Sequence, residues 1–159
     1  MVENWKVIPD YPKYYVSNLG RVKRTTVLKP FCTNKYERVT LYDVNNKRRH
    51  KRIHILVLST FRPNPKPDFY NQVDHINRNR RDNRLINLRW SNGSLNQLNS
   101  NARGYNLNKK NNKLEAKICV HGKIKHLGYF QNSVNARRAY LEAKREALKK
   151  LDPDQKYDV

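Results

Sequence analysis

The balance of charge constrains this chain more than any other feature of its sequence. It holds 34 Lys and Arg residues against 13 Asp and Glu residues, a formal net charge of +21. A compact chain with that excess repels itself, and a polyanion relieves the repulsion because each neutralised phosphate releases condensed counterions. Residues 11–36, 44–67 and 83–114 contain no acid, so the charge is spread along the chain. The sequence therefore favours nucleic acid as a partner over an anionic membrane or a merely well-solvated surface.

Length and cysteine content narrow the class of protein. The 159 residues suit one ordinary domain or two or three very small ones. Cys32 and Cys119 form no CxxC pair, so we expect no structural zinc and no disulfide framework. Residues 1–10 lack the pattern of a signal peptide, and no apolar run approaches membrane-spanning length. We expect a cytoplasmic protein with no membrane partner, located in the host cytoplasm if a bacteriophage encodes it.

The N-terminal half combines short strands with one apolar helix. Residues 2–42 read as strands and turns, with a turn at 17–20 and a strand at 39–44. We expect Trp5 and Tyr15 to form a small core there. Apolar side chains at helical spacing predict a helix over 53–61, which the prolines that follow terminate.

Two further patterns follow toward the C-terminus. The first is a strand at 73–75, a polar loop at 77–84, a strand at 85–90 and a helix capped by Ser91 or Asn92. The second is a pair of strands, 115–120 and 123–130, and a helix that begins at Ser133. The inner stripe of that helix is predicted to hold Ala136, Ala139, Tyr140, Ala143 and Ala147, while Arg137, Lys144, Arg145 and Lys149 face outward.

Asp74-His75 at a strand end, followed by several asparagines, is the segment that carries chemistry. Hydrolysis of a phosphodiester needs a base that deprotonates water and a divalent cation that stabilises charge. His75 supplies an imidazole whose tautomer a fixed acceptor can set, and Asn96 offers a carbonyl oxygen from the following helix. A site of oxygen donors with only a few protein ligands suits Mg²⁺ and leaves room for phosphate and water. Taken singly, each of these residues is more often structural, but their order and spacing in so basic a chain favour catalysis.

The text QVDHINRNRRDNRLINLRW, with a later Asn, resembles the HNH nuclease family and the phage and intron-encoded homing endonucleases within it. The resemblance implies that His75 is the general base and that Asp74 is a metal ligand. It implies that Asn87 braces the loop and orients His75, and that Asn96 fills the third position, where many members carry His. It also implies Mg²⁺ as cofactor, with Mn²⁺ as a substitute.

The text ENWKVIPDYPKYYVSNLGRVKR resembles the modular motif that often precedes HNH domains in such endonucleases. The basic side chains of this segment, Arg21, Lys23 and Arg24, are expected to meet phosphates. A purely structural cap on the nuclease is the alternative.

The text from Gly104 to Leu148 resembles the three-stranded-sheet-plus-helix DNA-binding domain of plant ethylene-response factors. Leu114 stands where that family often has Trp. The outer face of the sheet would enter the major groove of DNA, with lysines at 117, 123 and 125 as candidate readers.

These observations together predict an α+β chain of small modules. We expect an N-terminal motif at 1–48, a central ββα-metal (HNH) nuclease domain at 49–101, a sheet-plus-helix domain at 102–151 and a tail at 152–159. The predicted activity is metal-dependent nicking of double-stranded DNA by a monomer or a DNA-induced dimer. A non-catalytic DNA-binding regulator and an RNA-binding or RNA-cleaving protein are the alternatives. The residues expected to contact DNA are Arg21, Lys23, Arg89, Arg103, Lys113, Lys117, Lys123 and Lys125.

Overall fold

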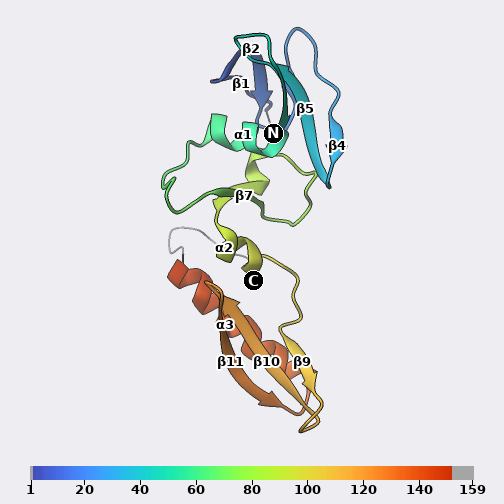
Figure 1. Cartoon of the computed structure of the whole chain (residues 1–159), viewed down its shortest axis with the longest axis vertical. Helices are drawn as coiled ribbons and strands as arrows, with labels where there is room; N and C mark the ends of the chain where they lie inside the picture. Colours follow the sequence, from blue (N-terminus) through green and yellow to red (C-terminus); the bar gives the residue numbers. More distant parts are fainter. Residues whose placement is uncertain (1, 152–159) are drawn as a thin grey trace. The chain divides into compact units, whose positions relative to one another are not determined.

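The chain divides into two units, residues 1–92 and residues 93–159. A computed structural model describes residues 2–151, and the predicted tail at 152–159 lies outside the described residues. Figure 1 shows a mixture of small sheets and helices in the described part, which confirms the predicted α+β class. No helix among residues 2–151 is long and apolar enough to cross a membrane. The division after Asn92 separates two parts of the chain that each pack mainly on themselves. It does not test the predicted module boundaries at 48 and 101, which stay predictions.

Two three-stranded antiparallel sheets form the first part of unit one. The sequence pattern predicts only one strand of the second sheet, because the last strand reads RRHKR and shows no apolar alternation. The first sheet contains β1 (Trp5–Ile8), β2 (Tyr11–Ser17) and β3 (Val22–Lys23), and the second contains β4 (Phe31–Thr33), β5 (Tyr36–Tyr42) and β6 (Arg48–Arg52).

Helix α1 (Ile53–Phe61) follows directly and has the predicted bounds. It buries Leu56, Val57 and Leu58 in succession, which shows that it is covered on most sides. It ends where the Arg62 backbone N–H donates to the Leu58 carbonyl at 2.8 Å, just before Pro63.

One hydrophobic core joins both sheets to α1. The N-terminal strands are therefore packed into the same body as the helix. The expected small core of Trp5 and Tyr15 is wrong, because Trp5 is only partly buried and Tyr15 is 37% exposed. The buried side chains of the shared core are Ile8, Tyr11, Tyr14, Val16, Val22, Val39, Leu41, Ile53, Leu56, Val57, Leu58 and Leu88.

A two-stranded antiparallel sheet completes unit one. β7 (Gln72–His75) pairs with β8 (Leu88–Ser91), and the register sets Asp74 opposite Arg89 and His75 opposite Leu88. The strand predicted at 85–90 begins instead with a short 3-10 helix, η1 (Leu85–Asn87). This turn lets the chain enter β8 directly from the polar loop.

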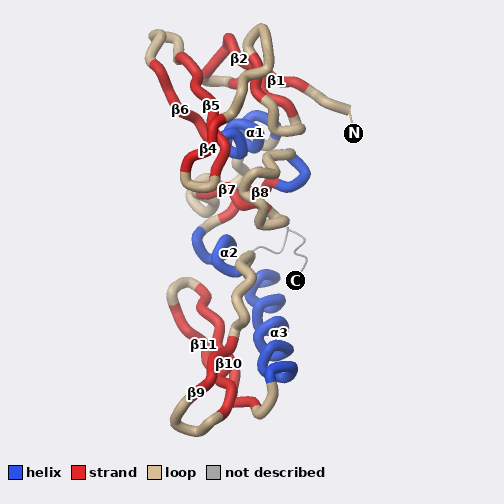
Figure 2. Tube along the Cα trace, turned by 90° about the vertical axis from the view of Figure 1, so that its right-hand side faces the viewer, coloured by secondary structure: helices blue, strands red, loops and turns tan. Residues whose placement is uncertain are grey.

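Unit two contains the predicted three-stranded sheet and helix (Figure 2). Its elements are α2 (Gly93–Leu98), β9 (Tyr105–Asn108), β10 (Lys113–Val120), β11 (Lys123–Phe130) and α3 (Ser133–Leu151), with the sheet order β11-β10-β9. Ala116 and Ile118 of β10 are buried, as are Ala136 and Tyr140 of α3, which packs on β10 and β11.

Two predictions about side-chain direction in unit two are wrong. Lys144 is 8% exposed and its Nζ lies 3.5 Å from the Ser100 carbonyl oxygen, because it continues the buried row of α3 at every fourth residue. On the sheet, Lys117 pairs with His126, whereas Lys125 pairs with the buried Ile118. Directly paired residues share a face. Lys123 and Lys125 therefore do not project from the face that carries Lys117.

Gly104 provides a test of the packing in unit two. It has φ +82°, and an added Cβ would lie 2.0 Å from Cγ of Tyr140. We expect Gly104→Ala to destabilise unit two by roughly 3 kcal/mol through backbone strain and overpacking. Amide hydrogen exchange of β10 in the whole chain measures the loss.

Gly122→Ala is the matched control. Gly122 has φ +73°, but nothing lies within 4 Å of an added Cβ, so only the left-handed backbone costs about 1 kcal/mol. Equal destabilisation by the two substitutions would contradict the tight contact of Gly104 with Tyr140.

Candidate active site

The end of β7 holds the Asp74-His75 pair in a buried position. Asp74 is 5% exposed and His75 is 3% exposed. Neighbouring residues of a strand face opposite ways, so the two side chains have different surroundings. Asp74 contacts β8, whereas His75 contacts α1, β5 and the loop that follows β7.

Arg89 lies opposite Asp74 and binds it. Arg89 Nε and Nη2 donate to Oδ2 of Asp74 at 3.0 and 2.7 Å, and both side chains are buried. The expectation that Arg89 contacts DNA conflicts with this geometry, because Arg89 is 8% exposed and its guanidinium binds a carboxylate inside the protein. A buried charge of this kind needs such a partner.

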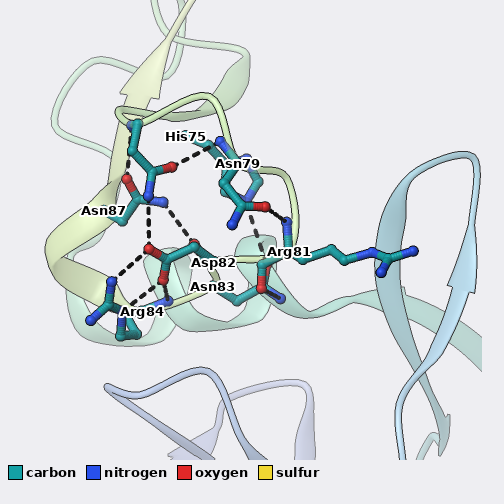
Figure 3. A network of polar contacts seen from close by, with 8 residues as sticks. His75, Asn79, Arg81, Asp82, Asn83, Arg84 and Asn87 are labelled. Carbon is teal, nitrogen blue, oxygen red and sulfur yellow. Dashed lines mark hydrogen bonds and ion pairs between the residues drawn. The ribbon is translucent and has the colours of Figure 1, made fainter.

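Asn87 braces the loop between β7 and β8 (Figure 3). Its Oδ1 accepts a hydrogen bond from the Asn77 backbone N–H at 2.9 Å, and its Nδ2 donates to the Asp82 carbonyl at 2.8 Å. The Asp82 carboxylate in turn accepts from Arg84 and from the Asn77 amide. These bonds tie both ends of the connection over residues 76–87 together, so the loop returns to β8 in one conformation.

Asn83 is the residue of this loop that faces His75. Asn83 Oδ1 lies 3.4 Å from Nε2 of His75, and Asn83 Nδ2 donates to Oε2 of Glu37 at 2.7 Å and to the Arg81 carbonyl at 3.3 Å. Both partners of Nδ2 can only accept, which fixes the orientation of the amide. An acceptor therefore faces Nε2, so neutral His75 carries its proton on Nε2 and its lone pair on Nδ1.

Sequence reasoning missed Glu37 and left Asn83 without a role. Asn83 lies within the segment that carries the family resemblance, but asparagine in a loop is usually turn chemistry. Glu37 lies on β5, 46 residues earlier, and nothing local marks it. Only the packing of unit one brings the two side chains together.

Rings from three elements surround His75. The ring of His54 on α1 lies 4.9 Å from that of His75, and the ring of Tyr36 on β5 lies 4.9 Å from His54 and 6.0 Å from His75. The guanidinium groups of Arg52 and Arg80, both exposed, each lie 5.2 Å from the centre of the Tyr36 ring. Tyr36 thus lies between two buried imidazoles and two surface cations.

Burial shifts both histidines toward the neutral form. Desolvation, opposed by the hydrogen bond to Asn83 and by Asp74, lowers the pKa of His75 below its ordinary value. Desolvation, with the positive charges of His75 and Arg52, lowers the pKa of His54 to about 3. The Nδ1 atom of His54 is buried and makes no hydrogen bond to any described residue.

The remaining predicted residues divide between the two units. Asn96 lies on α2, which packs against α3 in unit two, so its pairing with Asp74 stays a prediction. Among residues 2–151, no three His, Cys, Asp or Glu side chains gather to hold a metal ion. Arg21 is paired with Glu3, and Lys23 lies 4.3 Å from the centre of the Trp5 ring. Exposed at the surface of unit two are Arg103, Lys113, Lys117, Lys123 and Lys125.

His54 makes the stability of unit one depend on pH. Its folded-state pKa lies below that of an unfolded chain, so the stability is fully present above pH 6.5 and is lost as pH falls toward 3. The loss from this group alone is about 2 kcal/mol at pH 5. We expect urea unfolding at pH 7.5 and pH 5 to show this loss in the wild type and a smaller one in His54→Leu. The same loss in both proteins would contradict the shift.

Comparisons with known proteins find similarity over both the N-terminal and the central part of the chain. Residues 3–42 match the model of the NUMOD4 motif, and residues 51–98 match the model of an HNH endonuclease. Two uncharacterized HNH endonucleases of Acanthamoeba polyphaga mimivirus, L247 and L245, are 38% and 31% identical over 99 and 94 residues. These alignments cover 59% and 58% of this chain but only 25% and 28% of the relatives, so the chain spans about a quarter of their length.

One solved structure, described as DNA binding and cleavage by the HNH homing endonuclease I-HmuI, is similar over most of the chain. The similarity covers 96% of this chain and 91% of that one, at 26% identity and a TM-score of 0.56. The likeness of residues 102–151 to ethylene-response factors stays a prediction. The chain is thus similar to HNH endonucleases over residues 51–98, which hold Asp74, His75 and Asn87, and carries a match to the NUMOD4 motif before them.

Proposed function

We propose that this protein is a metal-dependent endonuclease that hydrolyses phosphodiester bonds in double-stranded DNA. The observation that carries the proposal is the state of His75, a buried imidazole whose Nε2 faces the side-chain carbonyl oxygen of Asn83. Such a ring is neutral at neutral pH and keeps a lone pair for a proton. The nucleases named above support the same reaction class.

His75 acts in this proposal as the general base. Nδ1 accepts a proton from the attacking water, and the imidazolium that forms is stabilised by its hydrogen bond to Asn83 and by the nearby carboxylates of Asp74 and Asp82. Asn87 keeps the loop, and with it Asn83, in place during this transfer.

Asp74 is the proposed ligand of a divalent cation in unit one. Its carboxylate is a hard oxygen donor, the class that Mg²⁺ and Mn²⁺ take. The amide carbonyl of Asn96 is a donor of the same class, and its part in the site stays a prediction. Arg89 holds the Asp74 carboxylate by its Oδ2 atom and so limits how the group can rotate. When bound, the cation supplies positive charge for the phosphate and the leaving oxygen.

The basic surface supplies the affinity for DNA in this proposal. The net charge of +21 provides phosphate contacts in both units, and Lys113 and Lys117 are the predicted lysines that the alternation of β10 leaves on the outer sheet face. One chain offers one His75, so the monomer cuts one strand at a time. A double-strand break requires a second chain or a second event.

Replacing His75 tests the activity. We expect the wild type with Mg²⁺ to convert supercoiled plasmid to open circle before any linear form, and to leave it intact with a chelator. His75→Ala should bind DNA equally well but cut about 10²- to 10⁴-fold more slowly, since it lacks the base. His50→Ala, which removes an exposed ring that lies 3.1 Å from the Thr40 hydroxyl, is the matched control.

The rival function has a distinct outcome in the same assay. If neither protein cuts with any divalent ion while both bind the plasmid, the chain is a DNA-binding regulator. A monomer that linearises plasmid with no open-circle stage would overturn the single-strand cut.

The rate of cleavage should depend on pH through His75. The base must be neutral, so the rate falls as acid protonates it, and burial places the pKa below the ordinary histidine value of 6.5. We therefore expect single-turnover cleavage with Mg²⁺ to stay constant from pH 8 to pH 6.5 and to decline tenfold per pH unit well below that. A decline that already begins above pH 7 would contradict a buried, neutral base.

A further inference from the structure

We propose that Glu37, in the N-terminal segment, is a positioning residue for His75 and acts through Asn83. The inference rests on the proposed function, because it concerns the same histidine. The segment at 3–42 matches the NUMOD4 motif and Glu37 lies inside it. The N-terminal strands thus contribute a member to the catalytic centre rather than only a DNA contact.

The chain of contacts runs Glu37–Asn83–His75. The bond from Asn83 Nδ2 to the Glu37 carboxylate, at 2.7 Å, is shorter than the 3.4 Å contact of Asn83 Oδ1 with His75 Nε2. Asn83 itself is 3% exposed. A primary amide can present either its oxygen or its nitrogen to His75, and the two choices are similar in shape. A carboxylate on the far side accepts only, so it selects the orientation in which oxygen faces His75.

This selection determines which nitrogen of His75 can act as a base. With oxygen facing Nε2, the proton stays on Nε2 and Nδ1 keeps the lone pair. With the amide reversed, its N–H groups would face Nε2 and the proton would move to Nδ1. The Arg81 carbonyl, 3.3 Å from Asn83 Nδ2, favours the same orientation, but it is neutral and its bond is longer.

A second set of contacts holds the same loop against the N-terminal turn. The Leu85 backbone N–H donates to the Asn18 carbonyl at 2.8 Å. Gly20 has φ +85°, and an added Cβ would lie 2.9 Å from Cβ of Asn83 and 3.0 Å from its backbone carbonyl. The N-terminal segment therefore contacts Asn83 by its backbone as well as through the Glu37 carboxylate.

A charge exchange tests the proposal in the whole chain. Glu37→Lys places a donor where the carboxylate stood, so Asn83 must turn its oxygen to Lys and its nitrogen to His75. Adding Asn83→Asp provides a group that accepts from both neighbours and restores an acceptor for Nε2. Long-range ¹H–¹⁵N spectra of His75 report which ring nitrogen carries the proton, without any need for cleavage.

We expect Glu37→Lys to reverse the tautomer of His75 and the second substitution, Asn83→Asp, to restore it. In the wild type the proton lies on Nε2. In Glu37→Lys it moves to Nδ1, and single-turnover cleavage falls about 10²-fold while DNA binding is equal or tighter. The double variant regains the Nε2 proton and cuts within about tenfold of the wild type. Glu146→Lys, the same change at an exposed position of α3, should alter neither tautomer nor cleavage.

Three outcomes overturn the proposal. One is a His75 proton found on Nδ1 in the wild type, a measurement that does not depend on the folding of any variant. Another is Glu37→Lys with unchanged tautomer and rate. The last is a slower Glu37→Lys whose tautomer is unchanged and whose rate the second substitution does not restore, since Glu37 is then only structural. A wild type that shows the Nε2 proton but never cuts refutes the endonuclease and leaves the role of Glu37 intact.

Discussion

Polar side chains buried beside one another impose the strictest requirement in unit one. Asp74, His75, Asn83, Asn87 and Arg89 are all less than a tenth exposed. Each needs hydrogen-bond partners, because a buried polar group without one costs on the order of 1 to 3 kcal/mol. Their mutual bonds, and the bond from Asn83 to Glu37, meet that need only when the β7–β8 loop has the conformation described above. The geometry around His75 is thus a consequence of satisfying buried groups.

The histidine pair shows how this requirement serves the chemistry. His54 is buried without a partner for Nδ1 among the described residues, so its ring is held by packing and stays neutral. A neutral neighbour packs against the ring of His75 without adding a competing charge. Tyr36 extends the same arrangement to the surface, where Arg52 and Arg80 stand over its ring. Two cations are therefore available close to the base, and they remain outside the buried layer.

Sequence reasoning worked where a local pattern decides the structure. The apolar run of α1 and the alternation of β10 are properties of short segments, and both elements lie where they were expected. It failed where distant partners decide. β6 has no apolar pattern and exists because it pairs with β5. Arg89 and Lys144 read as surface cations, yet strand register and helix packing bury both. Glu37 carried no signal at all, since its significance depends on a residue 46 positions away.

The core shared by the N-terminal sheets and α1 has a consequence for how such genes can change. Segments that fold independently can be exchanged between proteins by recombination without harm to either part. Here a crossover between β6 and α1 would separate Val16 and Leu41 from Leu56 and Leu58, and would leave the buried face of the helix open to water. Swapping partners at that junction is expected to yield aggregates rather than chimaeras. A junction after Asn92, where the packing of the chain divides, is the place where inherited pieces could be joined to new ones.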